Sequence, residues 1–413
     1  MTFSDDFVTI HHGDCLDVMH GMEPDSIDAI VTDPPYGLSF MGREWDHGVP
    51  GEAFWQEALR VAKPGCHLVA FGGTRTYHRL AVAIEDAGWE VRDCLGWLYG
   101  SGFPKSLDVS KAIDKEAGAE RAREKCGGLG SSTSFADDAW TQEHQGQRIV
   151  NEPITAAAAW SGWGTALKPA WEPIILARKP LTGTVAANVQ RWGTGAINID
   201  GCRIETDEVW DGRSMPNATD GVTWGGELNQ SSSSHPLGRW PANIVHDGSD
   251  EVLAVFPQAH LSPFASSVST GKPHDVYGGG MENYTGRGFS DSGSAARFFY
   301  CAKADKRERD DGLYDFPEQE AGVKNSSGRG YSERDPYANI MRRNIHPTVK
   351  PLDLMRWLVR LVTPPDGIVL DPFMGSGTTL KAARAEGHRS IGIDLEREHC
   401  EIAWGRLSQG VLL

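Results

Sequence analysis

The sequence predicts an α/β protein whose Rossmann-like, doubly wound sheet is assembled from both ends of the chain. Two motifs indicate this fold, an acidic turn at 33–36 and a glycine turn at 375–377. Each follows an apolar run typical of a buried strand. The third observation is that only 19 residues follow Asp394, and those at 396–407 form one closing helix. The other strands of such a sheet must therefore come from the N-terminal third.

Apolar segments bounded by turn residues supply these strands. We expect them at 8–11, 29–32, 67–71 and 92–98. Asp14 comes after the first strand, and Asp33 comes after the second. Ligands of open α/β sheets bind outside the carboxyl ends of the strands. The acidic turn and the glycine turn are therefore expected to open on the same edge of the sheet.

The acidic turn reads Asp33-Pro34-Pro35-Tyr36. Asp33 and Pro34 each precede a proline, which biases them toward extended backbone and fixes the direction of the Pro34 carbonyl. This carbonyl and the Asp33 carboxylate can accept both hydrogens of a planar exocyclic amine, and the Tyr36 ring can stack on a base. The motif thus favours chemistry on the amine of a nucleic-acid base. Taken alone, it is equally typical of a strand followed by a proline-rich turn.

The glycine turn belongs to a unit of strand, turn, helix and strand. A strand at 368–371 leads into Gly375-Ser376-Gly377-Thr378, a helix ends at Gly387, and a second strand at 390–394 ends in Asp394. Glycines let backbone approach a ligand, and a helix N-terminus favours an anionic group. The terminal acid can accept hydrogen bonds from ribose hydroxyls. The unit therefore predicts a nucleoside cofactor.

The spacing of the glycines narrows the identity of this cofactor. Position 380 is leucine, so the third glycine of a dinucleotide-binding turn is missing, as is the Gly-Lys-Ser/Thr ending of a phosphate loop. Dehydrogenases and NTPases are thereby disfavoured. S-adenosylmethionine, which carries one ribose and a carboxylate, fits better.

With its further ordered motifs, the chain resembles DNA amino-methyltransferases of the beta arrangement, in which the catalytic motif precedes the cofactor motif. Within that family it is most similar to bacterial and phage-type site-specific adenine methylases. The resemblance covers nearly the whole chain. The further motifs lie at 12–16, 60–65, 67–73, 102–106, 171–175, 239–243 and 346–351.

The resemblance implies an S-adenosylmethionine-dependent methyltransferase sheet in which Asp33, Pro34, Pro35 and Tyr36 are catalytic. Asp33 would face the target base, and Asp14 would face the adenine of the cofactor. No metal ligand is implied. The residues expected to bind the cofactor are Asp14, Cys15, Lys350, Asp371, Phe373, Gly375, Ser376, Gly377, Thr378 and Asp394.

Several residues allow two interpretations. Lys350 is expected to close over the methionine end of the cofactor, whereas the preceding His346-Pro347 is also typical of a capping turn. Glu172 is expected to order a loop. Trp97 and Phe103 are either core aromatics or aromatics that flank the target base.

The resemblance also implies a division of the chain. Residues 1–106 would be the catalytic half of the methyltransferase domain, and 335–413 would be its cofactor-binding half. Between them, 107–334 would form an inserted, loop-rich target-recognition and connecting lobe. Within this lobe we expect a helix at 110–125 and a hairpin at 195–204, where Asp-Gly is a hairpin signal.

The activity implied is methyl transfer from S-adenosylmethionine to N6 of adenine in a specific DNA sequence. The base would leave the stack and be attacked in line. Cytosine-N4 methylation and a catalytically silent DNA-binding protein of the same fold stay open as alternatives. Cytosine-N4 enzymes more often have serine at the position of Asp33, which favours adenine. The intact Asp33, Tyr36, Gly375 and Gly377 count against the silent protein.

Charge limits how the chain can bind its expected partner, DNA. The net charge of −16 and the pI near 5.3 argue against a broad, sequence-independent grip on DNA. Local contact with phosphates remains compatible with these values. Basic residues cluster at 178–179, 303–309 and 342–350, where solvated faces are the alternative interpretation. A homodimer and a cognate restriction enzyme are compatible with the family.

Composition indicates a cytoplasmic protein without a membrane partner. The seven cysteines are scattered, odd in number and contain no Cys-x-x-Cys, which argues against a disulfide framework or a zinc site. No apolar stretch approaches bilayer-spanning length, and the N-terminus lacks the regions of a signal peptide.

Overall fold

A computed structural model of the chain describes residues 1–38, 48–102, 104, 106–118, 123–125, 147–149, 155–206, 236–259, 293–302, 306–320, 341–346 and 348–408. Phe103, Pro347 and Lys303 lie outside these ranges. The chain divides into two compact units, one of Met1–Gly100 with Trp171–Leu413 and one of Ser101–Ala170.

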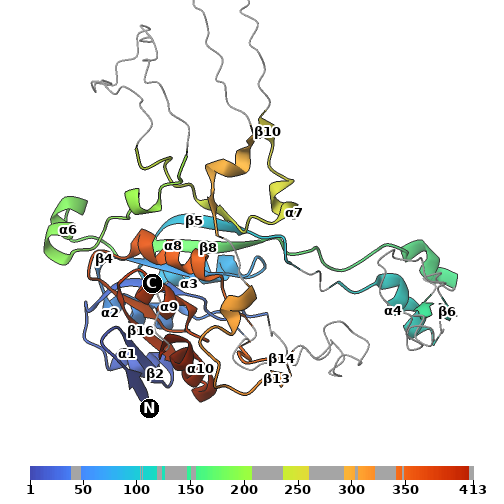
Figure 1. Cartoon of the computed structure of the whole chain (residues 1–413), viewed down its shortest axis with the longest axis horizontal. Helices are drawn as coiled ribbons and strands as arrows, with labels where there is room; N and C mark the ends of the chain where they lie inside the picture. The colour runs from blue at the N-terminus through green and yellow to red at the C-terminus, as the bar shows by residue number, and fades with distance from the viewer. Residues whose placement is uncertain are drawn as a thin grey trace, which may run out of the picture. The chain divides into compact units, whose positions relative to one another are not determined.

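The larger unit is built on a sheet of ten strands in the order β1-β2-β16-β15-β3-β4-β8-β5-β9-β12 (Figure 1). β1 and β8 run antiparallel to their neighbours, and the other neighbouring strands pair in parallel. The strands are β1 (Thr2–Ser4), β2 (Val8–His12), β3 (Ile27–Thr32), β4 (Ala62–Phe71), β5 (Glu90–Leu98), β8 (Trp171–Arg178), β9 (Ile244–His246), β12 (Tyr300–Cys301), β15 (Ile368–Asp371) and β16 (Arg389–Asp394).

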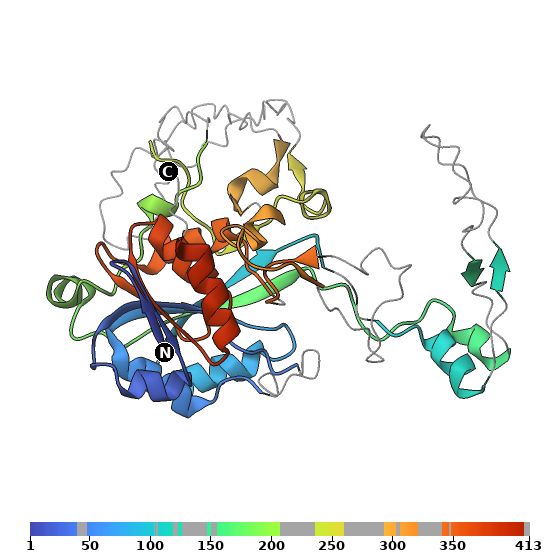
Figure 2. The same cartoon turned by 60° about the horizontal axis from the view of Figure 1, so that its bottom comes forward.

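Both chain ends share this sheet, as expected. β16 pairs with β2 and β15 pairs with β3, both in parallel. In Figure 2 the dark blue N-terminal strands lie beside the red C-terminal elements. The expected strands at 8–11, 29–32, 67–71 and 92–98 are confirmed as β2, β3, β4 and β5. The α/β fold class is thereby confirmed.

Helices cover both faces of the sheet because successive strand residues point to opposite faces. Ala29 and Val31 pack with the apolar residues of α8, whereas Ile30 packs with those of α2. α1 and α3 share the α2 side, and α9 shares the α8 side. The helices of this unit are α1 (Cys15–His20), α2 (Glu52–Val61), α3 (Tyr77–Asp86), α6 (Val185–Trp192), α7 (Asp250–Leu253), α8 (Leu352–Val362), α9 (Thr378–Ala385) and α10 (Arg397–Ser408).

The middle region contributes three strands to the sheet. β8 lies between β4 and β5 and pairs with both along its length, and β9 and β12 extend the sheet beyond β5. Residues 174–177 are buried on both faces, so they form a continuous apolar run without alternation. Residues 107–334 as a whole therefore do not form a lobe separate from the sheet, contrary to our expectation. Its role in target recognition stays a prediction.

Two local expectations in this region are wrong. The helix expected at 110–125 ends at Glu116, and Gly118 follows with a left-handed φ of +67°. At 195–204 the chain forms the 3-10 turn η4 (Asp200–Cys202) and no hairpin. There the Asn198 amide nitrogen donates to the Leu361 carbonyl at 2.8 Å, and the Cys202 side chain is buried. Packing on α8 thus overrides the turn signal.

The smaller unit contains α4 (Val109–Glu116), whose N-cap Asp108 accepts a hydrogen bond from the Lys111 amide at 3.1 Å. It also contains β6 (Arg123–Lys125), β7 (Gln147–Ile149) and η3 (Thr155–Trp160). The remaining short elements belong to the larger unit and are β10 (Gln258–Ala259), β11 (Gly293–Ser294), η5 (Ala295–Phe298), η6 (Lys306–Arg309), β13 (Gln319–Glu320) and β14 (Met341–Arg342).

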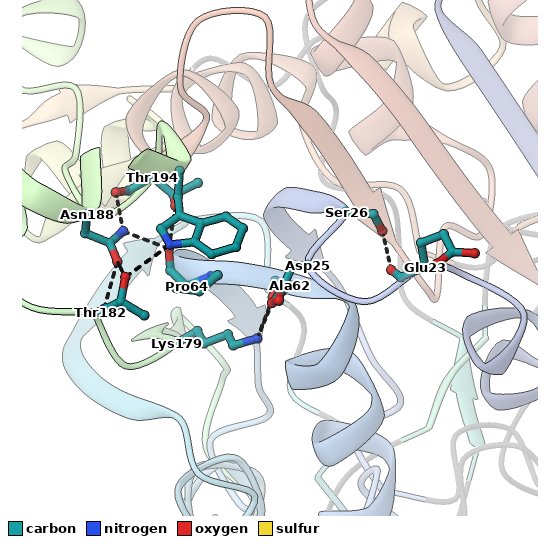
Figure 3. Close-up of polar contacts among 10 residues, drawn as sticks. Glu23, Asp25, Ser26, Ala62, Pro64, Lys179, Thr182, Asn188 and Thr194 are labelled. Atoms are coloured by element: carbon teal, nitrogen blue, oxygen red, sulfur yellow. Dashed lines mark hydrogen bonds and ion pairs between the residues drawn. The ribbon is translucent and has the colours of Figure 1, made fainter. Parts of the chain in front are cut away.

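A buried asparagine anchors α6 to the beginning of β4 (Figure 3). Asn188 is fully buried, and its Nδ2 donates to the carbonyls of Pro64 and Thr194, both at 2.8 Å. Its Oδ1 accepts from the Thr182 amide at 2.9 Å. The Thr182 hydroxyl in turn accepts from Trp192 Nε1 at 3.1 Å. All polar atoms of the asparagine side chain are thus used.

We expect Asn188→Ala to lower the free energy of unfolding by about 1–3 kcal/mol, because it removes the side-chain donor of the buried Thr194 carbonyl and one of the two donors of the Pro64 carbonyl. Chemical denaturation of the variant checks this value. Gln190→Ala, at an exposed position of the same helix, is the matched control and is expected to change stability little. Equal stability of Asn188→Ala and Gln190→Ala would contradict the anchoring role.

Candidate active site

The two predicted turns open on the same edge of the sheet. β3 and β15 are neighbouring parallel strands, so the turns that follow them lie at the carboxyl ends of adjacent strands. The chain leaves β3 toward β4 and leaves β15 toward β16 on the other side. Such a reversal of strand order is where open α/β sheets form a ligand crevice. A hydrogen bond of 2.7 Å from the Thr32 hydroxyl to Asp371 Oδ1 joins the two strand ends.

Four polar side chains meet at the acidic turn. The Tyr36 hydroxyl donates to Asp33 Oδ1 at 2.8 Å. The ammonium of Lys350 lies 3.3 Å from the same oxygen and 2.9 Å from Tyr36 Oη. Lys350 also donates to Glu172 Oε2 at 2.7 Å. These residues come from three segments of the chain that are distant in sequence.

Burial and the neighbouring charges shift the pKa values of Tyr36 and Lys350. Burial, reinforced by the Asp33 and Glu172 carboxylates, raises the pKa of Tyr36 well above its ordinary value, so the phenol keeps its proton and donates. Burial alone would lower the pKa of Lys350, but Asp33 and Glu172 raise it above the ordinary value. The lysine is therefore an ammonium ion held between two carboxylates.

The cluster modifies two expectations. Lys350 reaches the acidic turn, and its expected contact with the methionine end of the cofactor stays a prediction. Glu172, which we expected to order a loop, places its carboxylate on Lys350. Glu172 lies at the start of β8, and the sequence does not show that this strand runs antiparallel to β4. That direction brings the N-terminal end of β8 to the carboxyl edge of the sheet.

The glycine turn has a backbone that only glycine adopts easily. Gly375 has a φ of +50° and Gly377 a φ of +78°. The Gly375 amide donates to Asp394 Oδ2 at 3.0 Å, which ties the turn to the end of β16. Gly377 is the N-cap of α9, and no side chain caps this helix. The first amides of α9 are therefore available to an anionic ligand.

Asp371 is buried beneath this turn. Its Oδ1 accepts from Thr32 and from the Phe373 amide, and its Oδ2 accepts from the Thr379 hydroxyl at 2.5 Å. Burial raises the pKa of Asp371 to about 7, against the opposing effect of the threonine hydroxyls. The carboxyl group thus braces both strand ends from within the fold.

The pKa of Asp371 predicts a pH dependence of stability. Because its folded pKa of about 7 lies above the ordinary value of 3.8, the native state retains a proton that the unfolded chain releases. Stability from this group is therefore lost as the pH rises from about 4 to about 7. Asp371→Asn removes the titration and keeps the shape.

Between pH 4 and pH 7 the free energy of unfolding of Asp371→Asn should rise relative to that of the wild type by an amount on the order of 3 kcal/mol. Above this range the difference between the two proteins should be constant. Chemical denaturation at several pH values measures both proteins. A difference that does not change between pH 4 and pH 8 would contradict a buried, proton-retaining Asp371.

Other cofactor-site candidates surround the turn. Asp14 is the N-cap of α1 and accepts from the Leu16 amide at 2.8 Å. Burial raises the pKa of the adjacent Cys15 thiol to about 12. Phe373 packs on Phe54 with ring centroids 4.8 Å apart. These residues lie at or after the carboxyl ends of β2 and β15.

Three further residues support the glycine turn, and the sequence indicated none of them for this role. Arg406 on α10 is 2% exposed, and its Nη1 donates to the Ser376 carbonyl at 2.6 Å and to Thr378 Oγ1 at 3.1 Å. The sequence indicates only that Arg406 lies about one turn after Ala403, on the same face of the helix. The other two are His346 and His399, and no sequence signal marks them as a pair.

These histidines border the glycine turn. His399 Nδ1 lies 3.1 Å from Asp394 Oδ1, and the His346 ring packs edge-on against it with centroids 4.6 Å apart. Burial and the neighbouring His399 lower the pKa of His346 to about 4, so that ring is neutral near pH 7. The neutral His346 ring borders Gly375, with its Nε2 nearest to the position that a Cβ at residue 375 would take.

Within the described ranges, no group of three or more His, Cys, Asp or Glu side chains is arranged to hold a metal ion. In the same part of the chain, no helix is both long enough and apolar enough to cross a membrane.

Comparison with known proteins gives a family match along most of the chain. The family model N6_N4_Mtase, described as DNA methylase, matches residues 27–404, which include both turns. Type II methyltransferase M.ScaI of Streptomyces caespitosus is 35% identical over 95 residues, 23% of this chain and 27% of that protein. Type II methyltransferase M2.DpnII of Streptococcus pneumoniae is 47% identical over 62 residues, 15% of this chain and 23% of that protein.

The chain thus spans about a quarter of the length of these curated relatives. Among solved structures, the PvuII DNA methyltransferase (cytosine-N4-specific) is 12% identical, with a TM-score of 0.43. The alignment covers 98% of this chain and 87% of that one. Such a distant likeness adds nothing to the fold described above.

Proposed function

The chain belongs to the DNA methylase family, and from this premise we propose that it methylates N6 of adenine in a specific DNA sequence with S-adenosylmethionine as donor. The observation that carries the proposal is the joint position of the two turns. An amine-accepting turn and a nucleoside-binding turn follow neighbouring parallel strands, so their ligands would meet at one edge.

The residues at the glycine turn fit S-adenosylmethionine. Side chains are absent where Gly375 and Gly377 bend with positive φ, and the uncapped N-terminus of α9 suits the carboxylate of the donor. Asp394 would accept from the ribose hydroxyls, and Asp14 would lie toward the adenine. Asp371 and Arg406 would shape the turn from beneath. When bound, the donor supplies an electrophilic methyl group on a sulfonium ion.

The acidic turn would prepare the target amine. Its two hydrogens would be accepted by Asp33 and by the Pro34 carbonyl, which favours a pyramidal nitrogen with an available lone pair. Within the described ranges, Asp33 Oδ1 has two partners and Oδ2 has no hydrogen bond, so Oδ2 is free for the amine. Tyr36 would stack on the base. The base must leave the duplex to reach this edge.

Adenine is favoured over cytosine by the aspartate at position 33, where cytosine-N4 enzymes more often carry serine. Residues outside the two turns would supply sequence recognition, and the middle region is the proposed source. A homodimer, a cognate restriction enzyme and a cytoplasmic location stay predictions that accompany this function.

Nucleoside analysis tests the proposal. The purified chain is incubated with unmethylated bacterial DNA and S-adenosylmethionine carrying a labelled methyl group, and the DNA is then digested to nucleosides. Label in N6-methyldeoxyadenosine is the expected result. Label in N4-methyldeoxycytidine would overturn the base assignment, and no label in any nucleoside would favour the silent DNA-binding protein.

A further inference from the structure

Two carboxylates share one ammonium ion beside the proposed target site. Asp33 and Glu172 each have an oxygen within 3.3 Å of Lys350 Nζ, and the lysine side chain is only 11% exposed. Tyr36 donates to Asp33 Oδ1 at 2.8 Å and lies 3.4 Å from Glu172 Oε2. The three charged groups come from separate segments, so the fold itself assembles them.

We propose that Lys350 and Glu172 are positioning residues that orient the Asp33 carboxylate and balance its charge for the target amine. The proposal rests on the proposed function, because it takes Asp33 as the acceptor of that amine. Neither Lys350 nor Glu172 needs to touch the base or the donor. Their effect reaches the reaction only through Asp33.

Charge balance is the first part of the argument. Asp33 and Glu172 alone would be two like charges at a partly buried site, where like charges favour the binding of a proton by one of them. The ammonium between them attracts both and removes this tendency. Among the described residues, the other titratable groups that face this site are the Tyr36 and Tyr99 phenols and the Asp371 carboxyl from beneath. None of these described groups is cationic, so Lys350 supplies the balance.

Orientation is the second part. Lys350 and Tyr36 both engage Oδ1 of Asp33, which fixes the rotation of the carboxylate. A carboxylate held by one oxygen presents its other oxygen in a set direction. Glu172 fixes the position of the Lys350 ammonium, because its Oε2 lies 2.7 Å from Nζ, closer than Asp33 Oδ1 at 3.3 Å. The lysine can therefore remain in place while the amine approaches Asp33.

The pH dependence of methyl transfer to DNA tests the proposal. In Lys350→Met the two carboxylates lose their shared cation, so one of the pair should bind a proton more readily. Activity should then be lost at a pH about one to three units higher than in the wild type as the pH falls. Lys350→Met combined with Glu172→Gln should move this loss back toward the wild-type pH, because the like charge is gone.

Two further variants separate this effect from simple loss of structure. Lys350→Arg keeps the cation and should keep the acid side of the wild-type profile. Glu172→Gln alone should not move the loss of activity to higher pH. Should Lys350→Met fail to fold, an upward shift in Glu172→Gln would still overturn the proposal. Lower activity of Lys350→Met by the same factor at every pH, without recovery in the double variant, would overturn it as well.

Stability against pH gives a readout that does not require catalysis. In Lys350→Met the native state retains an extra proton, so its melting temperature should fall relative to the double variant as the pH rises from about 4 to about 7. This pattern in a protein that methylates no DNA would leave the charge-balancing pair standing and reject the proposed function. Normal methylation of DNA by the wild type, together with parallel melting profiles of Lys350→Met and the double variant, would support the proposed function and reject the charge-balancing pair.

Discussion

Asp33→Ala is expected to reduce methyl transfer to DNA by at least about 10²–10³-fold, a loss typical of removing a well-placed polar group from an active site. Asp33 would accept a hydrogen of the amine and favour a pyramidal nitrogen. Glu172 also contacts Tyr36 and Lys350, but it lies on β8 and not in the acidic turn. Affinity for S-adenosylmethionine should be nearly unchanged, because the donor is assigned to the glycine turn.

A filter-binding assay with tritiated methyl groups measures the transfer, and calorimetry measures the donor affinity. Asp86→Ala removes an exposed carboxylate from α3 and serves as the matched control. Wild-type turnover in Asp33→Ala would end the catalytic assignment. Tyr36→Ala should be less damaging if its main contribution is stacking, which is worth about 1–3 kcal/mol per base.

The second large effect is expected from a side chain at the glycine turn. In Gly375→Val the new Cβ would lie 2.6 Å from His346 Nε2, and in Gly377→Val it would lie 2.8 Å from the Cβ of Ala403. Both positions also have positive φ, which a β-branched residue adopts only with strain. Each variant should lose donor affinity by roughly 100-fold or more, equivalent to about 2.8 kcal/mol.

Gly387→Ala is the control for backbone strain alone. Gly387 has a φ of +80°, close to that of Gly377, but a Cβ there would meet nothing within 4 Å. This variant should bind S-adenosylmethionine as the wild type does, with a small loss of stability. Unchanged donor affinity in both valine variants, measured by calorimetry on folded protein, would refute the assignment of this turn to the cofactor.

The sheet was predictable where strands carried motifs at their ends. β3 with Asp33 and β15 with the glycine turn could be placed because an acid or a glycine follows each apolar run. Strands from the N-terminal third were expected to share the sheet with the glycine-turn unit, and β2 indeed pairs with β16. These inferences depend on local pattern, which a sequence contains.

The cluster around Asp33 depends on contacts that a sequence does not contain. Lys350 and Glu172 are 178 residues apart, and they meet because β8 runs antiparallel between β4 and β5. A central antiparallel strand with a continuous apolar run gives no sign of its direction. The hairpin expected at 195–204 failed for a related reason, since burial of Cys202 outweighs the local turn preference.

Long-read sequencing of host DNA is the most direct test of the central claim that this chain methylates adenine N6 at a specific site. The gene is expressed in a bacterial strain without DNA methylases, with Asp33→Ala expressed in parallel. N6-methyladenine in one sequence context with the wild type, and none with the variant, is the result that this account predicts. N4-methylcytosine in such a context, or no modified base from a well-expressed, folded protein, would contradict it.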